Sequence, residues 1–279
     1  NGMLLDGNGD GIPGDAYAFN FSIDGAETPF PTPLTSLRPR GAGVFQGVVD
    51  DVGFHAPGDI DVYTLELTAA AGPCVAALRL TPTLGSPLAL IRLVDPMGTV
   101  LGSAAAPAPG ESAFTGIIPI TEGGLYRIEA ECSEGYGSCE LELLLNAAFE
   151  GEAYGGNPND TLGSAQQMDF VPLPSRSGVA NASVHGILEH NDMTWENGED
   201  IYRVALTAGD ELTVILSGLS AASGLRISLL DDGGDTLALD VDPDDPAVDR
   251  VICGYRATAN MDVSIIVSGD MGDETEYTL

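Results

Sequence analysis

The chain carries two copies of the same short motifs in the same order, and this repetition limits the possible folds more than any other feature. The segment Asp61–Ala69 (DVYTLELTA) returns as Asp200–Ala208 (DIYRVALTA). A second matched pair, Leu93–Leu101 and Leu229–Leu237, follows the two copies at a nearly equal distance. Motifs that recur in order at one long spacing indicate a duplicated domain and not a solenoid of short units.

Apolar residues alternate with more polar ones in both copies. Tyr63, Leu65 and Leu67 alternate in this way, and other strand-length runs are bounded by Gly, Pro, Asp or Ser. The 36 glycines and 18 prolines supply many turns, and no stretch sustains a helical period. We therefore predict an all-β chain of two tandem antiparallel sandwiches, with Tyr63 and Tyr202 on the core side of their strands.

We divide the chain into three parts. Residues 1–33 form an N-terminal segment that ends in a proline-rich linker, residues 34–148 form the first repeat, and residues 149–279 form the second. Each repeat is long enough to bury a core of its own. The abrupt start at Asn1 and the strand-like end at Tyr277–Leu279 suggest a piece of a larger polypeptide, or a mature form that has lost its targeting signals.

The charge balance excludes several classes of partner. The chain has 42 acidic and 10 basic residues, for a net charge of -32, and every basic residue is Arg. Such a chain repels nucleic acid and anionic lipid, because both require a cationic surface. No apolar run approaches the roughly 20 residues of a membrane helix. The acidic surface instead permits cation binding and solubility in salty surroundings.

The four cysteines suggest a disulfide. Cys132 and Cys139 flank a Gly/Ser-rich stretch between strand-like segments, so we expect a disulfide that closes a hairpin and implies an oxidising compartment. Zinc is a weaker alternative, because six residues separate the pair and no histidine lies nearby. Cys74 and Cys253 are expected to be buried thiols, with a bridge between the repeats as the alternative.

A candidate calcium loop opens the chain. Its proposed ligands are Asp6, Asn8, Asp10, the carbonyl of Ile12, and Asp15. The first three occupy alternate positions, and Gly11 permits the tight turn of an EF-hand-type loop. Tyr17 stands where the usual bidentate Glu would be, so Asp15 would substitute, as in the dockerin-like or thrombospondin-type loops that this segment resembles. The alternative is a simple Gly/Asp turn before the strand Tyr17–Ile23.

The second repeat resembles a known family. The motifs that carry the resemblance are Asn159–Ala165, Asp200–Tyr202, Leu206–Asp210 and Leu229–Asp231. They are similar to the bacterial pre-peptidase C-terminal domain, a family that includes the collagen-binding domains of clostridial collagenases. The first repeat matches through Gly58–Tyr63, Leu67–Ala69, Leu93–Asp95 and Gly124–Ile128, but lacks the Asn-Asp-Thr motif. Together the motifs cover most of residues 40–279.

The resemblance implies a jelly-roll-like sandwich, no catalysis, and in some members calcium bound between the N-terminal linker and the sheet edge. The implied ligands are Glu150, Glu152, Asn159, Asp160 and Asp200, with Glu199 as a further candidate. Residues 154–158 lengthen the spacing relative to the family pattern. Calcium takes six to eight oxygen ligands and would gather these acids. The alternative is that they cap turns in a solvated loop.

Templates for catalysis are absent from the sequence. There is no nucleophile elbow, zinc-protease helix motif or phosphate-binding loop. We expect His55, His185 and His190 to lie at the surface or in turns. Trp195, the single tryptophan, stands in a polar loop as either a stacking platform or a loop anchor.

These observations predict a calcium-stabilised, non-catalytic module of a larger secreted bacterial protein, with a structural or adhesive role at the cell surface. One alternative is a collagen- or polysaccharide-binding module appended to a secreted hydrolase, and another is a self-assembling surface-layer or fibre subunit. The expected partners are other domains of the parent protein or neighbouring subunits, and extracellular matrix or polysaccharide.

Overall fold

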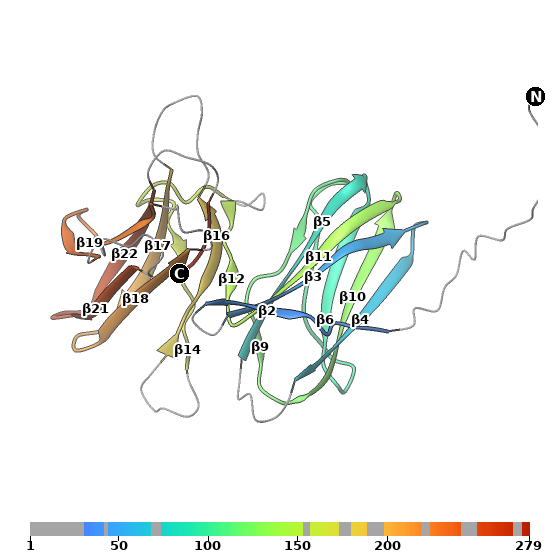
Figure 1. Cartoon of the computed structure of the whole chain (residues 1–279), viewed down its shortest axis with the longest axis horizontal. Coiled ribbons are helices and arrows are strands. Elements are labelled where there is room, and N and C mark those ends of the chain that lie inside the picture. Colours follow the sequence, from blue (N-terminus) through green and yellow to red (C-terminus); the bar gives the residue numbers. More distant parts are fainter. Residues whose placement is uncertain are drawn as a thin grey trace, which may run out of the picture.

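The computed structural model describes residues 31–41, 44–67, 74–152, 157–172, 180–188, 198–218, 224–240, 250–269 and 275–279. These residues form β-strands joined by turns, so the predicted all-β class is confirmed (Figure 1). No helix in these ranges is long and apolar enough to span a membrane. The loop that contains Asp6, Asn8, Asp10, Ile12 and Asp15 lies outside the described residues, as do His190 and Trp195.

The first sandwich packs two sheets face to face. One sheet has the order β1-β4-β10-β6-β7, and the other has the order β2-β3-β11-β5-β8, with β9 also paired to β5. The strands are β1 (Thr32–Pro33), β2 (Leu37–Gly41), β3 (Val44–Phe54), β4 (Asp59–Leu67), β5 (Cys74–Gly85), β6 (Leu88–Val94), β7 (Val100–Ala105), β8 (Ala113–Phe114), β9 (Ile118–Ile120), β10 (Gly124–Glu134) and β11 (Gly137–Leu145).

The second sandwich repeats most of this strand order, but its edge strand β12 pairs in parallel with β16, whereas β2 pairs antiparallel with β3. Its sheets have the orders β13-β17-β22-β19-β20 and β12-β16-β23-β18-β21, and β14 and β15 form a separate pair. The strands are β12 (Ala148–Phe149), β13 (Gln166–Gln167), β14 (Val171–Pro172), β15 (Ala180–Asn181), β16 (Val184–Leu188), β17 (Glu199–Leu206), β18 (Glu211–Gly218), β19 (Arg226–Asp231), β20 (Thr236–Leu239), β21 (Arg250–Arg256), β22 (Met261–Ser268) and β23 (Thr275–Thr278). The repeated DVY/DIY motif thus lies on β4 and β17, which hold the same place in their sheets.

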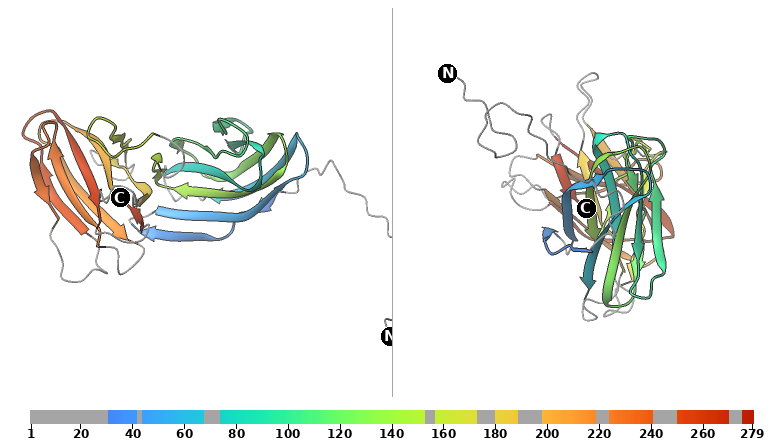
Figure 2. Two further views of the ribbon diagram at one scale, coloured as in Figure 1. Left: turned by 90° about the horizontal axis from the view of Figure 1, so that it is seen from above. Right: turned by 90° about the vertical axis from the view of Figure 1, so that its right-hand side faces the viewer.

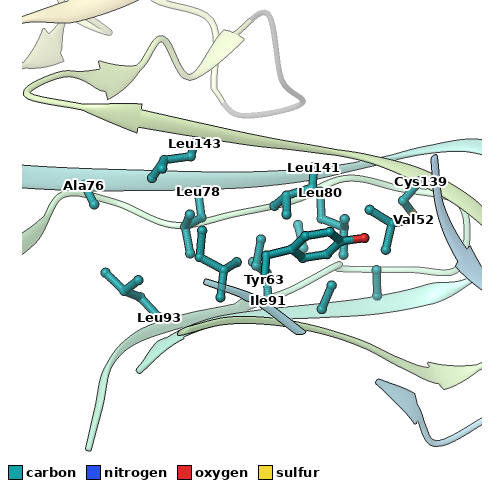
Figure 3. Packing of buried hydrophobic residues seen from close by; sticks show 14 of the residues in the cluster. Val52, Tyr63, Ala76, Leu78, Leu80, Ile91, Leu93, Cys139, Leu141 and Leu143 are labelled. Atoms are coloured by element: carbon teal, nitrogen blue, oxygen red, sulfur yellow. The ribbon is translucent and has the colours of Figure 1, made fainter. Parts of the chain in front are cut away.

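Each sandwich has its own apolar core between its sheets. In the first, Leu78 and Leu80 on β5 face Ile91 and Leu93 on β6, and Tyr63 lies among them (Figure 3). In the second, Tyr202 occupies the position that corresponds to Tyr63 and is fully buried. The prediction that both tyrosines face the core is confirmed by their burial. It followed from the alternation of strand residues between the two faces of a sheet.

The second repeated motif forms a tight turn at equivalent places in the two sandwiches. The Oδ1 atom of Asp95 accepts from the N–H groups of Met97 and Thr99, at 2.9 and 2.7 Å. Oδ1 of Asp231 likewise accepts from Gly233 and Asp235, both at 2.9 Å. An aspartate that binds the backbone two and four residues onward fixes such a turn. The motif recurs because it joins β6 to β7 and β19 to β20.

The expected disulfide is not formed. Cys132 lies on β10 and Cys139 on β11, which belong to opposite sheets, so the chain between them crosses the sandwich and does not close a hairpin. Both cysteines are buried free thiols, and the Cys132 thiol donates to the carbonyl of Glu134 at 3.1 Å. Burial raises the pKa of Cys139 to about 12. Cys74 is half-buried and Cys253 is exposed, so the expected burial of Cys253 is also wrong.

Candidate metal centre

Three carboxylates converge where the chain passes into the second sandwich. Glu150 follows β12, Glu152 lies two residues further on, and Asp200 is the second residue of β17. One oxygen from each lies within 4.8 Å of the others. Glu150 and Asp200 are buried and Glu152 is half-buried. Within the described residues this carboxylate cluster is the one such group of three acidic, histidine or cysteine side chains.

Backbone hydrogen bonds hold the first two acids in place. The N–H of Glu150 donates to the carbonyl of His185 on β16 at 2.9 Å, which extends the short pairing of β12 with β16. The next N–H, of Gly151, donates to the side-chain oxygen of Gln166 at 2.8 Å. The N–H of Glu152 then donates to Oε1 of Glu150 at 3.0 Å. The turn is therefore fixed at three successive residues, and both carboxylates face β17.

Asn159 completes the arrangement from the opposite side. It is 1% exposed, its N–H donates to Oε2 of Glu152 at 3.1 Å, and its carbonyl accepts from Ile201 of β17 at 3.0 Å. The Asn159 carboxamide lies 3.1 Å from both Oε1 of Glu150 and Oε2 of Glu152, and its nitrogen, turned toward them, donates to both acids.

A buried pair of tyrosines is hydrogen-bonded to Asp200. The Tyr277 hydroxyl donates to Oδ2 of Asp200 at 2.5 Å, and the hydroxyls of Tyr202 and Tyr277 are hydrogen-bonded to each other. The two rings meet edge to face, with centroids 6.5 Å apart. Burial raises the pKa of Asp200 to about 8; the Tyr277 hydrogen bond opposes this rise, and the nearby carboxylates of Glu150 and Glu152 add to it. Without a cation, burial and the neighbouring carboxylates therefore favour the neutral form of Asp200.

The predicted ligands separate into two groups. Glu150, Glu152, Asn159 and Asp200 meet, even though residues 154–158 lengthen the spacing between them. Glu199 is exposed, because it precedes Asp200 on β17 and alternate residues point to opposite faces. Its candidacy as a ligand is not supported. Asp160 is also exposed and stays outside the carboxylate cluster, although its charge contributes to the raised pKa of Asp200.

The first repeat offers no matching group among its described residues. Asp61 occupies on β4 the place that Asp200 occupies on β17, and Asp59 accepts from the N–H of His55 at 2.9 Å. Within the described residues, Asp59 and Asp61 form no group with a third acidic, histidine or cysteine side chain.

Two residues at the site were not predicted. His185 is 1% exposed and its Nδ1 lies 3.0 Å from the carbonyl of Tyr277, so its expected surface position is wrong. Burial lowers the pKa of His185. The available signal was its place in the apolar run Val184–Leu188, which forms β16. Tyr277, which donates to Asp200, carried no signal beyond its position in a strand-like run.

A cleft of about 460 Å³ lies beside the carboxylate cluster, between the two sandwiches. Phe114 and Ile117 of the first sandwich line one side, and Gln166 and Met168 of the second line the other. Gly151, which lies between the two glutamates of the cluster, also lines it. The half-buried Glu152 thus stands next to a solvent-filled space.

Comparisons with known proteins do not assign a family. No protein-family model and no curated protein matches the chain. The exported protein XepA of PBSX is 10% identical over 84% of this chain and 85% of its own, with a TM-score of 0.29. A Paenibacillus xanthan lyase is 13% identical over 91% of this chain and 27% of its own, with a TM-score of 0.27. A secreted protein of Parabacteroides distasonis is 5% identical over 88% of this chain and 89% of its own, with a TM-score of 0.19. Scores this low carry no argument about this chain.

Proposed function

We propose that this chain is a calcium-stabilised, non-catalytic module of a secreted or cell-surface protein, in which two β-sandwiches have a structural or adhesive role. The carboxylate cluster is the observation that carries the proposal. Buried carboxylates repel one another, and an isolated buried charge is costly, so such a group requires protons or a cation. The Asn159 carboxamide lies against Glu150 and Glu152, so the cluster is also bordered by a buried amide.

The donor set favours calcium among the common metal ions. The converging atoms are oxygens from three carboxylates, and hard cations take such ligands. Zinc sites are instead built mainly from cysteine and histidine side chains. Magnesium requires near-octahedral geometry and keeps several waters, which a largely buried cluster accommodates poorly. Extracellular calcium modules work at about 10⁻⁴–10⁻³ M, which fits a site ordered after export.

The position of the cluster supports a structural role. A cation held by Glu150, Glu152 and Asp200 would tie the segment that follows β12 to β17, so binding would stabilise the start of the second sandwich. A net charge of -32 suits a protein that stays soluble in salty surroundings. The exposed aromatic side chains among the described residues, Phe45, Tyr136 and Phe170, come from three separate segments and so lend no support to a collagen- or sugar-stacking strip.

Thermal unfolding in calcium and in chelator tests the proposal. We expect calcium to raise the unfolding temperature of the wild-type protein, and Glu152→Gln to lose most of that rise. Glu199→Gln is the matched control, because it removes an equal charge from an exposed position nearby. Native mass spectrometry should show one ion fewer in Glu152→Gln than in the control. Equal calcium shifts in the two variants, or no shift in the wild type, would overturn the proposal.

A further inference from the structure

Part of the outer face of one sheet in the first sandwich is buried where the second sandwich meets it. Val44, Ala77 and Leu144 are each fully buried, yet they belong to neither core. They pack with Ala147 and Phe149 in a separate junction cluster, against which Ile187 of β16 also packs. The two sandwiches lie end to end, with the junction cluster where they meet (Figure 2).

A row of polar side chains borders the junction cluster on the same face. This polar row takes one residue from each of β2, β3, β11 and β5: Arg40, Gln46, Glu142 and Arg79. Arg40 donates to Gln46, Gln46 donates to Glu142, and Arg79 donates to the other oxygen of Glu142. Gln46 and Glu142 are 6% and 2% exposed, although they point away from the core of their own sandwich.

Both ends of the polar row reach residues of the second sandwich. Nη1 of Arg40 lies 3.6 Å from Oε2 of Glu276 on β23. The Arg79 guanidinium carbon lies 5.6 Å from the ring centroid of Phe149 on β12, within cation–π range. An apolar centre bordered by paired polar groups is the usual anatomy of a specific interface. The buried Arg79–Glu142 pair belongs to the first sandwich, whereas the Arg40–Glu276 pair crosses the junction at its exposed border.

The connection between the sandwiches leaves little freedom for a hinge. Only Asn146 and Ala147 separate β11 from β12. Asn146 has a φ of 66°, in the left-handed region that Asn tolerates better than most residues, and its N–H donates to Val75 of β5 at 2.7 Å. Ala147 is itself buried in the junction cluster. The linker is therefore part of the packed interface.

We infer that the two sandwiches are docked as one rigid body, at an angle fixed by the junction cluster and the polar row. This goes beyond the proposed calcium role, because none of these contacts involves the carboxylate cluster. The tandem would behave as a single stiff spacer and not as two modules on a flexible linker.

Ala77→Arg tests the inference. Ala77 is fully buried in the junction cluster with Ala147 and Phe149 and belongs to neither sandwich core, so a guanidinium at this position blocks the interface. Thr83→Arg is the matched control, an exposed position on the same strand. Spin labels on the exposed Cys253 and on a cysteine replacing Met97, in a Cys74→Ala background with chelator present, give the distance between the sandwiches.

We expect one narrow distance distribution in the wild type and in Thr83→Arg, and a broad one in Ala77→Arg. A broad wild-type distribution, or a narrow one in Ala77→Arg, would overturn the inference. If Ala77→Arg fails to fold, the Arg40–Glu276 pair gives a second test. Glu276→Arg should broaden the distribution, and adding Arg40→Glu should narrow it again. An unchanged distribution in Glu276→Arg would count against fixed docking. The measurement in chelator keeps this outcome separate from the calcium proposal.

Discussion

Replacing Asp200 with Asn should stabilise the protein in chelator and weaken its response to calcium. Without a cation, burial raises the pKa of Asp200 from its ordinary 3.8 to about 8. The folded state then binds a proton that the unfolded state releases, so stability falls as the pH rises from about 4 to about 8. At pH 7, about three pH units above the ordinary pKa, this difference amounts to roughly 4 kcal/mol.

Asparagine has nearly the same shape as aspartate and keeps an acceptor for the Tyr277 hydroxyl, but it does not titrate. In chelator at pH 7, Asp200→Asn should therefore be more stable than the wild type, by up to roughly 4 kcal/mol. At pH 4 the two should be nearly equal. In calcium the difference in free energy of unfolding between Asp200→Asn and the wild type should shrink or change sign. An ion at 100 times its Kd adds about 2.7 kcal/mol to the stability of the protein that binds it.

Urea unfolding at pH 4, 7 and 8.5, in chelator and in calcium, gives the required free energies. Far-UV circular dichroism follows the loss of the strands on unfolding. Glu199→Gln again serves as the control for loss of one negative charge, and should follow the wild type in both conditions. If Asp200→Asn is less stable than the wild type in chelator at every pH, Asp200 is ionised and stabilising without metal. That result would refute the reasoning.

Two further substitutions test the packing around the site, and a thiol-reactivity measurement tests the burial of the cysteines. Gly186→Ala should lower the free energy of unfolding in urea by about 1–3 kcal/mol, because its Cβ would lie 2.6 Å from the Tyr277 ring. Gly53→Ala is the control and should cost far less, because nothing lies within 4 Å of its Cβ. Equal costs would contradict the packing. Tyr277→Phe removes the hydrogen bond to Asp200 and should cost about 1–2 kcal/mol above pH 8, and less at pH 4, where Asp200 is neutral. In the native protein one thiol, that of Cys253, should react quickly with a disulfide reagent, and fast reaction of the two core cysteines would show that they are not buried.

The fold was largely predictable because its signals are local. The alternation around Tyr63 and Tyr202 shows which side of each strand faces the core, and the repeated order of motifs indicates the duplication. The turns at Asp95 and Asp231 recur for an equally local reason, since each aspartate binds backbone within four residues. Such features depend on neighbours in the sequence, so a single chain suffices to find them.

The candidate site was only partly predictable because pairing across sheets leaves no local signal. Cys132 and Cys139 lie close in sequence, but a change of sheet between them cannot be distinguished from a hairpin by composition. His185 is buried because Tyr277 and Glu150 approach it from distant segments. Glu199 and Asp200 are chemically similar neighbours, and only the phase of β17 decides which one faces the other acids.

The strand order also determines when each sandwich can complete its folding during synthesis. In each sandwich a late strand fills a central place: β11 pairs with both β3 and β5, and β23 pairs with both β16 and β18. During synthesis the first sandwich can close once Leu145 has emerged, whereas the second stays open until Thr275–Thr278 of β23 arrive. Until then β16 and β18 expose unpaired edges that invite misassembly. Deletion of residues 275–279 alone would therefore leave the first sandwich intact and the second without its central strand.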